Sequence, residues 1–229
     1  MKTVIFGHRG IPVKFPENSL AGFQYALEHG VEGLEFDVHL TRDNVPVIMH
    51  DERIDRTTNG QGRLRELTYH QLRQFKLANG ESVPCLQELL ALVGRQPVSL
   101  NLEFKTDQIQ YQGIEARVLR CVAQTPLAQN VIYSSFNIAT LQMANAIAPN
   151  QQYCYLADHV IQAPITFIRQ QHLSGLHLSH YQPLRDYPER IWTVNDTPTL
   201  QKCFQNQVAG IFTDDFEHAM AVRAGKVMR

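Results

Sequence analysis

Hydrophobic and polar residues alternate without a break from Leu34 to Leu40, in the segment LEFDVHL. Successive side chains of a β-strand point to opposite faces, so the pattern predicts a strand with Glu35, Asp37 and His39 on one face. The two carboxylates would stand roughly 7 Å apart. If that face is buried, each anion needs a cation or a metal, and a hard divalent cation would meet the need. If it lies in water, the carboxylates are simply solvated.

The same alternation recurs in the segment PVSLNLEFK, residues 97–105. Its apolar positions are Leu100, Leu102 and Phe104, and its polar positions are Asn101, Glu103 and Lys105. Two strands of this kind favour one shared polar interior over two separate solvated faces.

Strand-like and helix-like stretches alternate along most of the chain. The first strand ends at His8, and a short strand after the carboxylate strand ends at His50. A helix is predicted over 19–30, with Asn18 or Ser19 as the N-cap and Gly30 as the stop. Further strands are predicted at 130–137, 152–157, 175–179, 190–196 and 209–215, and further helices at 86–93, 114–122, 138–147, 164–172 and 197–205. Roughly eight strands with intervening helices favour a TIM (β/α)8 barrel, and an open doubly wound sheet is the alternative.

One segment, about 51–84, breaks this alternation. It is polar, contains three glycines, and has one short predicted helix at 68–76. We interpret it as a small insertion after the second barrel strand region. Because the chain shows no repeat, low-complexity tract or linker, we expect residues 1–229 to form a single domain.

Composition and charge exclude several classes of protein. The formal net charge is -1, without the basic patch that nucleic-acid binding needs or a polybasic tail for an anionic membrane. The four cysteines are far apart, which argues against a zinc or redox site and indicates small buried hydrophobes. The N-terminal segment has too few apolar residues for a signal peptide, and no apolar run is long enough to insert stably in a membrane. We therefore expect a cytoplasmic enzyme.

Several short motifs together resemble the glycerophosphodiester phosphodiesterase family over nearly the whole chain. Besides the carboxylate strand they are GHRG at 7–10, PENS at 16–19, MHD at 49–51, DRTTNGQG at 55–62, NLEFK at 101–105, SSF at 134–136 and WTVN at 192–195. The resemblance implies a TIM barrel with the family's insertion at about 51–84. It also implies metal-dependent hydrolysis of a glycerophosphodiester to glycerol 3-phosphate and an alcohol.

The resemblance assigns roles to individual residues. Glu35, Asp37 and Glu103 would hold one Mg²⁺ or Ca²⁺ ion, and His8 and His50 would be the general acid and base. The chemistry is consistent with these roles, because oxygen ligands suit a hard cation and imidazoles titrate near neutral pH.

Arg9 and Lys105 would bind the phosphate. With these two cations and the divalent ion, the three carboxylates leave a charge of +1, which a phosphodiester monoanion would balance. Which histidine is the acid, and whether water or the substrate's own hydroxyl attacks, stays open.

Other residues receive weaker assignments. Trp192, the only tryptophan, is either a core residue or a wall of the substrate site, and strand geometry would place Asn195 on the opposite face. Glu17 is expected to support Arg9 or the turn, and His39 to line the site. Asn18 and Ser19 are expected to be caps. His177 and His180 have no convincing metal spacing. The chain departs from the family pattern at Phe216 and Cys85.

Three alternatives remain from the sequence. A related barrel phospholipase would act on intact lipids and would need an exposed apolar rim. A non-catalytic phosphate- or metal-binding barrel would bind without turnover. An aldolase would use Lys105 as a Schiff base, although neighbouring carboxylates would favour the charged amine. The preferred head-group alcohol, the choice of ion and the oligomeric state are not predicted.

Overall fold

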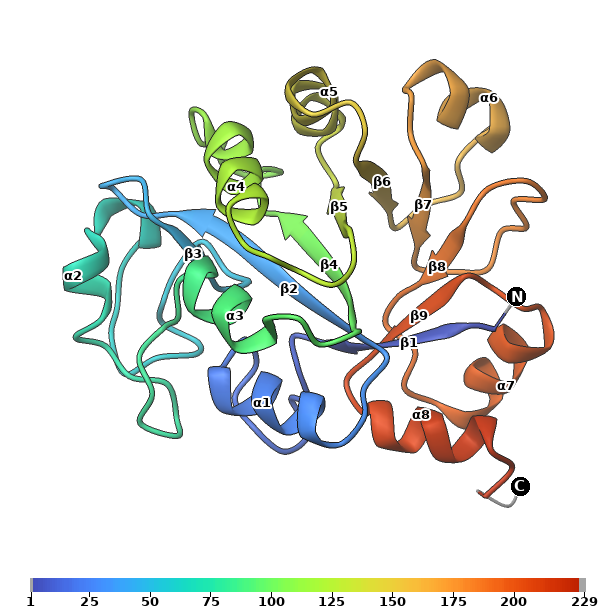
Figure 1. Ribbon diagram of the computed structural model, residues 1–229, viewed down its shortest axis with the longest axis horizontal. Helices are drawn as coiled ribbons and strands as arrows, with labels where there is room; N and C mark the ends of the chain where they lie inside the picture. Colours follow the sequence, from blue (N-terminus) through green and yellow to red (C-terminus); the bar gives the residue numbers. More distant parts are fainter. Residues whose placement is uncertain (1, 227–229) are drawn as a thin grey trace.

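The computed structural model describes residues 2–226, and within them nine strands form one sheet. Eight strands are mutually parallel, and β1 pairs with both β2 and β9, which closes the barrel (Figure 1). They are β1 (Val4–His8), β2 (Gly33–Leu40), β4 (Ser99–Phe104), β5 (Val131–Ser135), β6 (Gln152–Ala157), β7 (Gly175–Leu178), β8 (Glu189–Ile191) and β9 (Gly210–Thr213). The predicted TIM barrel is confirmed, and the open sheet is excluded.

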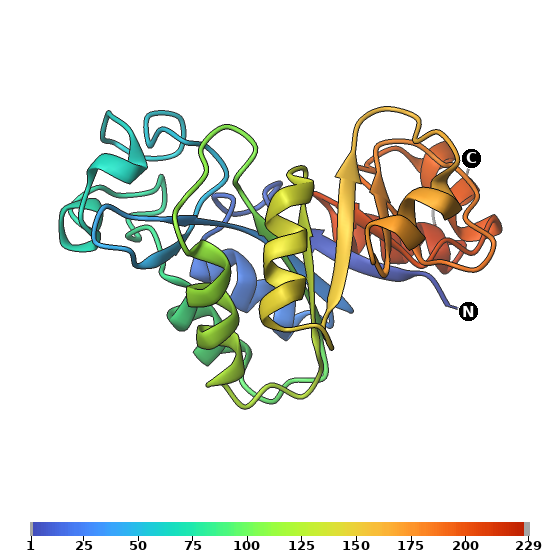
Figure 2. The same cartoon turned by 90° about the horizontal axis from the view of Figure 1, so that it is seen from above.

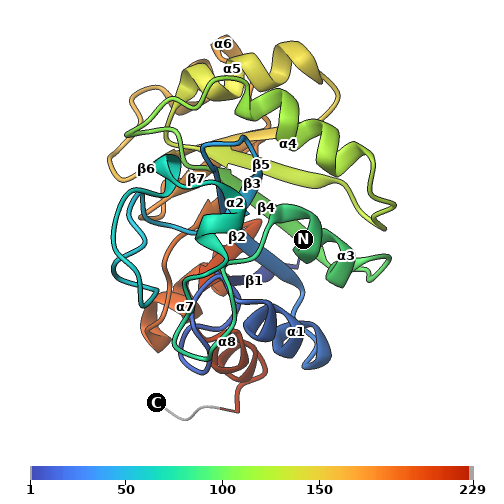
Figure 3. The ribbon, with the colours of Figure 1, turned by 90° about the vertical axis from the view of Figure 1, so that its left-hand side faces the viewer.

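The helices surround this barrel and cover its outer face (Figure 1). They are α1 (Leu20–Glu28), α3 (Leu86–Val93), α4 (Ile114–Ala123), α5 (Ile138–Ile147), α6 (Pro164–Gln170), α7 (Thr197–Gln205) and α8 (Phe216–Arg223). Seen from the side of the insertion, α1 and α8 lie below the strands, and α4 and α5 lie above them (Figure 3). None of the helices in residues 2–226 is long and apolar enough to cross a membrane.

The alternating residues of β2 divide between two buried environments. Leu34, Phe36, Val38 and Leu40 belong to the main hydrophobic core, and Phe23 of α1 packs edge-on against Phe36 with ring centroids 6.2 Å apart. All eight residues of β2 are buried, so its polar face points into the barrel. The alternative of a solvated polar face is therefore wrong.

Apolar side chains fill the part of the barrel interior that lies nearer the amino ends of β1 and β2 than the polar groups do. Phe6 and Phe212 meet there with ring centroids 5.0 Å apart, and Ile132 and Cys154 complete the cluster. A Cβ atom at Gly33 would lie 2.4 Å from the Phe6 ring, so only glycine fits beside this ring at the start of β2. The packing fixes where β2 begins, and hence the height at which Glu35 enters the barrel.

The insertion follows β3 (Pro46–Ile48), which pairs antiparallel with β2. It projects from one end of the molecule (Figure 2) and contains the short helices η1 (Leu64–Glu66) and α2 (Tyr69–Leu72). A second hydrophobic cluster holds it together, made of Val47, Met49, Ile54, Leu64, Leu72, Leu77 and Val83. Helix α2 is shorter than the predicted 68–76, because Thr68 caps its start and the helix ends after one turn.

The four cysteines are free, as expected. Cys154 and Cys203 are buried, but Cys85 and Cys121 are only partly so, and the prediction that all four are buried is wrong for these two. Cys85 instead precedes α3 as its N-cap residue, where its backbone N–H donates to Glu88 Oε2 at 2.9 Å.

Candidate active site

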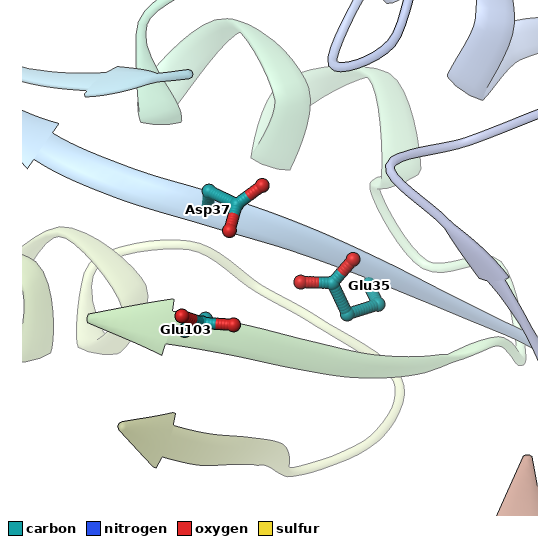
Figure 4. A group of neighbouring side chains, drawn as sticks. All are labelled: Glu35, Asp37 and Glu103. Atoms are coloured by element: carbon teal, nitrogen blue, oxygen red, sulfur yellow. The ribbon is translucent and has the colours of Figure 1, made fainter. Parts of the chain in front are cut away.

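Three carboxylates converge inside the barrel at the carboxyl ends of two neighbouring strands (Figure 4). β2 carries Glu35 and Asp37, β4 carries Glu103, and the parallel register sets Asp37 directly beside Glu103. All three are buried, and each offers an oxygen within 4.8 Å of the others. The strand alternation thus brings together the three predicted metal ligands.

Glu35 is the carboxylate of the cluster whose negative charge is least stabilised. Burial raises its pKa well above the usual value, and the charges of Asp37 and Glu103 raise it further. Its Oε1 is buried without a hydrogen-bond partner. A carboxylate oxygen in that state suits a hard cation, and three oxygen donors fit Mg²⁺ or Ca²⁺ better than a soft metal.

Two cations flank the carboxylates. Arg9 Nε lies 3.3 Å from Asp37 Oδ2, and Lys105 Nζ donates to Glu103 Oε1 at 2.8 Å. Burial raises the pKa of Asp37, but the charges of Arg9 and Lys105 outweigh it and lower the pKa overall. Burial likewise lowers the pKa of Lys105, but Glu103 and Asp37 raise it overall. A charged amine is not a nucleophile, so the structure gives no support to the aldolase alternative.

Each of the two predicted catalytic histidines contacts a carboxylate through Nδ1. His8, at the end of β1, pairs with Asp214 Oδ1 at 2.7 Å, and its Nε2 faces Glu35 Oε2 at 3.9 Å. His50 pairs with Asp51 Oδ1, also at 2.7 Å. A carboxylate on Nδ1 fixes both the ring orientation and the tautomer, which leaves Nε2 to exchange protons. Each imidazole is therefore oriented like a general acid or base.

Asp214 has no role in the sequence prediction, although it directly follows β9. A polar residue at the carboxyl end of the last barrel strand is a signal that could have indicated it. Asn195 Nδ2 donates to Asp214 Oδ2 at 2.7 Å and helps to hold it beside His8.

A cavity of about 140 Å³ lies beside Glu35, Glu103 and the two histidines. Its lining contains His8, Arg9, Glu35, His50, Asn101, Glu103, Lys105, Phe136, Leu156, His177, Trp192, Thr193 and Phe212. Trp192 stands edge-on to Phe136 with centroids 5.5 Å apart, so one wall is aromatic. A space of this size holds four or five molecules of about 30 Å³ such as water, and so suits a small polar ligand.

The expectation that Trp192 and Asn195 lie on opposite faces assumes a continuous strand through both residues. Strand β8 ends at Ile191, so residues 192–195 are not extended strand and the two-residue alternation does not apply to them. Trp192 lines the cavity while Asn195 reaches Asp214.

Two further side chains, which do not line the cavity, contact residues of the site. Arg9 Nη1 donates to Glu17 Oε1 at 3.1 Å, as predicted for Glu17. Ser19 is the N-cap of α1, but Asn18 is not a cap, because its Nδ2 donates to Asp37 Oδ2 at 2.9 Å. The prediction that His39 lines the site is also wrong.

His39 lies behind the cavity wall, where its Nε2 donates to the backbone carbonyl of His50 at 3.0 Å and its Nδ1 meets the Tyr111 hydroxyl, also at 3.0 Å. His177 does line the cavity, but it accepts a hydrogen bond from Arg190 and its pKa is lowered well below the usual value by burial and by Arg190. It therefore stays neutral.

Known proteins match this chain in sequence and in fold. Residues 8–175 match the sequence profile of the glycerophosphoryl diester phosphodiesterase family. A glycerophosphodiester phosphodiesterase of Caldanaerobacter subterraneus subsp. tengcongensis is 31% identical over 234 residues, which cover 95% of this chain and 96% of that protein. One of Bacillus altitudinis is 29% identical over 246 residues, 96% of this chain and 98% of that protein. An Oleispira antarctica phosphodiesterase, solved in complex with the product sn-glycerol-3-phosphate, superposes with a TM-score of 0.91 at 25% identity and covers 97% of each chain.

Proposed function

The chain belongs to the glycerophosphoryl diester phosphodiesterase family and is an enzyme of that class, and from this premise we propose how its residues divide the reaction. Glu35, Asp37 and Glu103 hold one divalent ion, Mg²⁺ or Ca²⁺, and His8 and His50 are the general acid and base. The observation that carries the proposal is the buried carboxylate cluster, with its unpartnered Glu35 oxygen, beside two imidazoles that are each oriented by a carboxylate.

The substrate's phosphate is bound by positive charge. Arg9 and Lys105 both line the cavity and bring two fixed cations to it. When bound, the divalent ion would add Lewis-acid stabilisation of the charge that develops on the phosphoryl oxygens. Together these charges exceed those of the three carboxylates by one, which matches a phosphodiester monoanion.

Each of the two histidines transfers a proton to or from the reactants through its Nε2 atom. One imidazole takes a proton from the attacking hydroxyl as its oxygen bonds to phosphorus. The other gives a proton to the departing head-group alcohol as its oxygen–phosphorus bond breaks. The attacking hydroxyl belongs to water or to the free glycerol hydroxyls of the substrate. Attack by water gives sn-glycerol 3-phosphate and the free alcohol in one step. Attack by the adjacent glycerol hydroxyl releases the alcohol and leaves a cyclic phosphodiester, and water must then attack phosphorus and break the bond to that hydroxyl to give sn-glycerol 3-phosphate.

The aromatic wall contacts the carbon atoms of the substrate. Trp192 and Phe136 offer flat apolar faces, and the Trp192 indole N–H already donates to the backbone carbonyl of His177 at 3.1 Å. The indole is thus fixed in place before substrate arrives, and it binds carbon rather than phosphate. In this role Trp192 forms a wall of the substrate site, and it also packs against the hydrophobic cluster around Phe6 and Phe212.

The metal requirement is tested with purified protein and glycerophosphocholine. Release of choline and glycerol 3-phosphate is measured after chelation and after addition of single divalent metals. Cleavage that depends on Mg²⁺ or Ca²⁺ supports the proposal, and an absence of cleavage under every divalent metal overturns it. Phospholipid vesicles in a parallel assay test the phospholipase alternative.

The proton-transfer roles are tested by His8→Ala and His50→Ala. Each variant is expected to lose roughly 10²–10⁴-fold in kcat while its thermal unfolding stays close to that of the parent. His159→Ala is the matched control, because His159 is exposed and its Nδ1 pairs with Asp158, away from the proposed site. Full activity in both active-site variants would remove the acid–base assignment.

A further inference from the structure

Arg56 of the insertion binds two carboxylates at once. Its Nε and Nη2 donate to Asp51 at 2.6 and 2.9 Å, and its Nη1 and Nη2 donate to Glu17 at 2.7 Å each. Both contacts are bidentate, a geometry that the planar guanidinium provides and that a lysine ammonium does not. Arg56 lies in the motif DRTTNGQG, to which the reaction described above gives no role.

The two carboxylates that Arg56 binds are the ones that hold two groups of the active site. Asp51 accepts from His50 Nδ1 at 2.7 Å, and Glu17 accepts from Arg9 Nη1 at 3.1 Å. A continuous path of hydrogen bonds therefore runs from His50 through Arg56 to Arg9. One end of the path is a proton-transfer group and the other is a phosphate-binding cation.

Charge explains why the path needs its central guanidinium. Asp51 and Glu17 are two anions from separate segments that meet at one place, the first in the insertion and the second in the loop after β1. Without Arg56 they would repel each other, and each would draw its own partner out of position. Arg56 and His50 together hold the pKa of Asp51 well below its usual range, so Asp51 remains an acceptor for the imidazole N–H.

We propose that Arg56 is a positioning residue that fixes His50 and Arg9 simultaneously, so that the insertion completes the active site. The proposal rests on the functions assigned above to His50 and Arg9. It predicts that loss of one side chain, which does not itself line the cavity, impairs both turnover and substrate binding.

The proposal separates into two contributions that can be measured. Asp51→Asn alters the direct partner of His50 and is expected mainly to lower kcat. Glu17→Gln alters the direct partner of Arg9 and is expected mainly to raise KM. Arg56→Met is expected to do both, with kcat lower by about 10- to 100-fold, the size that a displaced catalytic group produces. Arg56→Lys keeps the charge but not the two bidentate contacts, and is expected to recover only part of the loss.

Coupling is tested by combining the changes. When Asp51→Asn and Glu17→Gln are already present, Arg56→Met is expected to have little further effect on kcat or KM, because both of its partners are altered. If Arg56→Met lowers activity by the same factor in the Asp51→Asn, Glu17→Gln background as in the parent, Arg56 acts elsewhere and the proposal is overturned. Arg53→Met is the control, since Arg53 lies in the same segment and pairs with Asp55 at 2.8 Å.

Chemical rescue distinguishes positioning from general support of the fold. The Arg56 side chain is 50% exposed, so a small guanidinium ion can reach the space that Arg56→Ala leaves. Methylguanidinium, well below denaturing concentrations, is expected to restore kcat to Arg56→Ala and to leave Arg53→Ala unchanged. No rescue of a variant that unfolds at the parent's temperature would count against the proposal.

His50→Ala in the same assays distinguishes a failure of the catalytic assignment from a failure of the proposal for Arg56. If His50→Ala retains activity, the catalytic assignment fails and the proposal fails with it. If His50→Ala is inactive while Arg56→Met keeps parental kcat and KM, only the role of Arg56 is refuted.

Discussion

Replacing Glu35 by glutamine is expected to stabilise the metal-free protein while abolishing its response to divalent ions. Glu35 shares its buried site with two carboxylates and two cations, so one negative charge of the three is left without a counter-ion. Glutamine has nearly the same shape and no charge. The substitution therefore removes repulsion without creating a cavity.

The size of the effect follows from the spacing. The ligand oxygens of the cluster all lie within 4.8 Å of one another, and like charges at that separation repel by about 3 kcal/mol at the effective dielectric constant of about 20 that suits protein sites. A proton taken up by Glu35 relieves part of this repulsion. For a chain of 229 residues, about 3 kcal/mol corresponds to a rise in Tm of roughly 6–12 °C.

The sign of the pH dependence follows from the direction of the pKa shift. The pKa of Glu35 is raised in the folded state, so the folded protein binds more protons than the unfolded chain once pH exceeds the ordinary carboxyl value. The parent therefore loses stability as pH rises above about 4.5. The gain from Glu35→Gln should be small near pH 4.5 and larger at neutral pH.

Scanning calorimetry in the presence of a chelator, at acidic and at neutral pH, measures this gain. Adding Mg²⁺ or Ca²⁺ at about 100 times its Kd should then stabilise the parent by about 2.7 kcal/mol and leave Glu35→Gln unchanged. Glu28→Gln on the exposed face of α1 is the control, and it should match the parent in both measurements. The reasoning is refuted if metal-free Glu35→Gln is less stable than the parent, or if the ion stabilises both equally.

Three further predictions concern the scaffold. Burial raises the pKa of Glu189 to about 7, so stability should fall by up to about 2 kcal/mol between pH 4.5 and 7, and urea titrations of Glu189→Gln should lack this fall. Burial lowers the pKa of His39 to about 4, so up to about 3 kcal/mol should be lost as pH falls from 6.5 to 4; an equally steep loss in His39→Gln would contradict this. A Cβ at Gly60 would lie 2.2 Å from Phe75, so Gly60→Ala should cost about 1–3 kcal/mol in urea unfolding, and unchanged stability would exclude the clash.

The sequence is most informative where a local rule determines the answer. A two-residue period with charges on one side predicts a strand and not a helix, so β2 and β4 follow from short segments alone. The inward direction of Glu35, Asp37 and Glu103 is only favoured by the recurrence of this pattern in two strands, and the burial of β2 decides it. The closed barrel follows from the number and spacing of strands. In both cases the prediction rests on a pattern that recurs along the chain, the alternation of residues in a strand and the alternation of strands with helices.

The sequence is least informative where a side chain can make two local contacts that are equally reasonable. Asn18 suits a helix cap as well as it suits Asp37, and only the approach of β2 decides between them. His39 shares a face with the carboxylates, but Tyr111, distant in sequence, turns it away from the cavity. The position of Asp214 after the last strand could have marked it as a site residue, but its contact with His8 follows only from the pairing of β9 with β1, which no local pattern reports.

That pairing of the first and last strands has a consequence for biosynthesis. His8 leaves the ribosome before Asp214, which lies 206 residues later in the chain. A nascent chain would already carry every proposed metal ligand and both imidazoles, yet the Nδ1 atom of His8 would lack its carboxylate partner until Asp214 had been synthesised. Chains that end before Asp214 would therefore be poor catalysts.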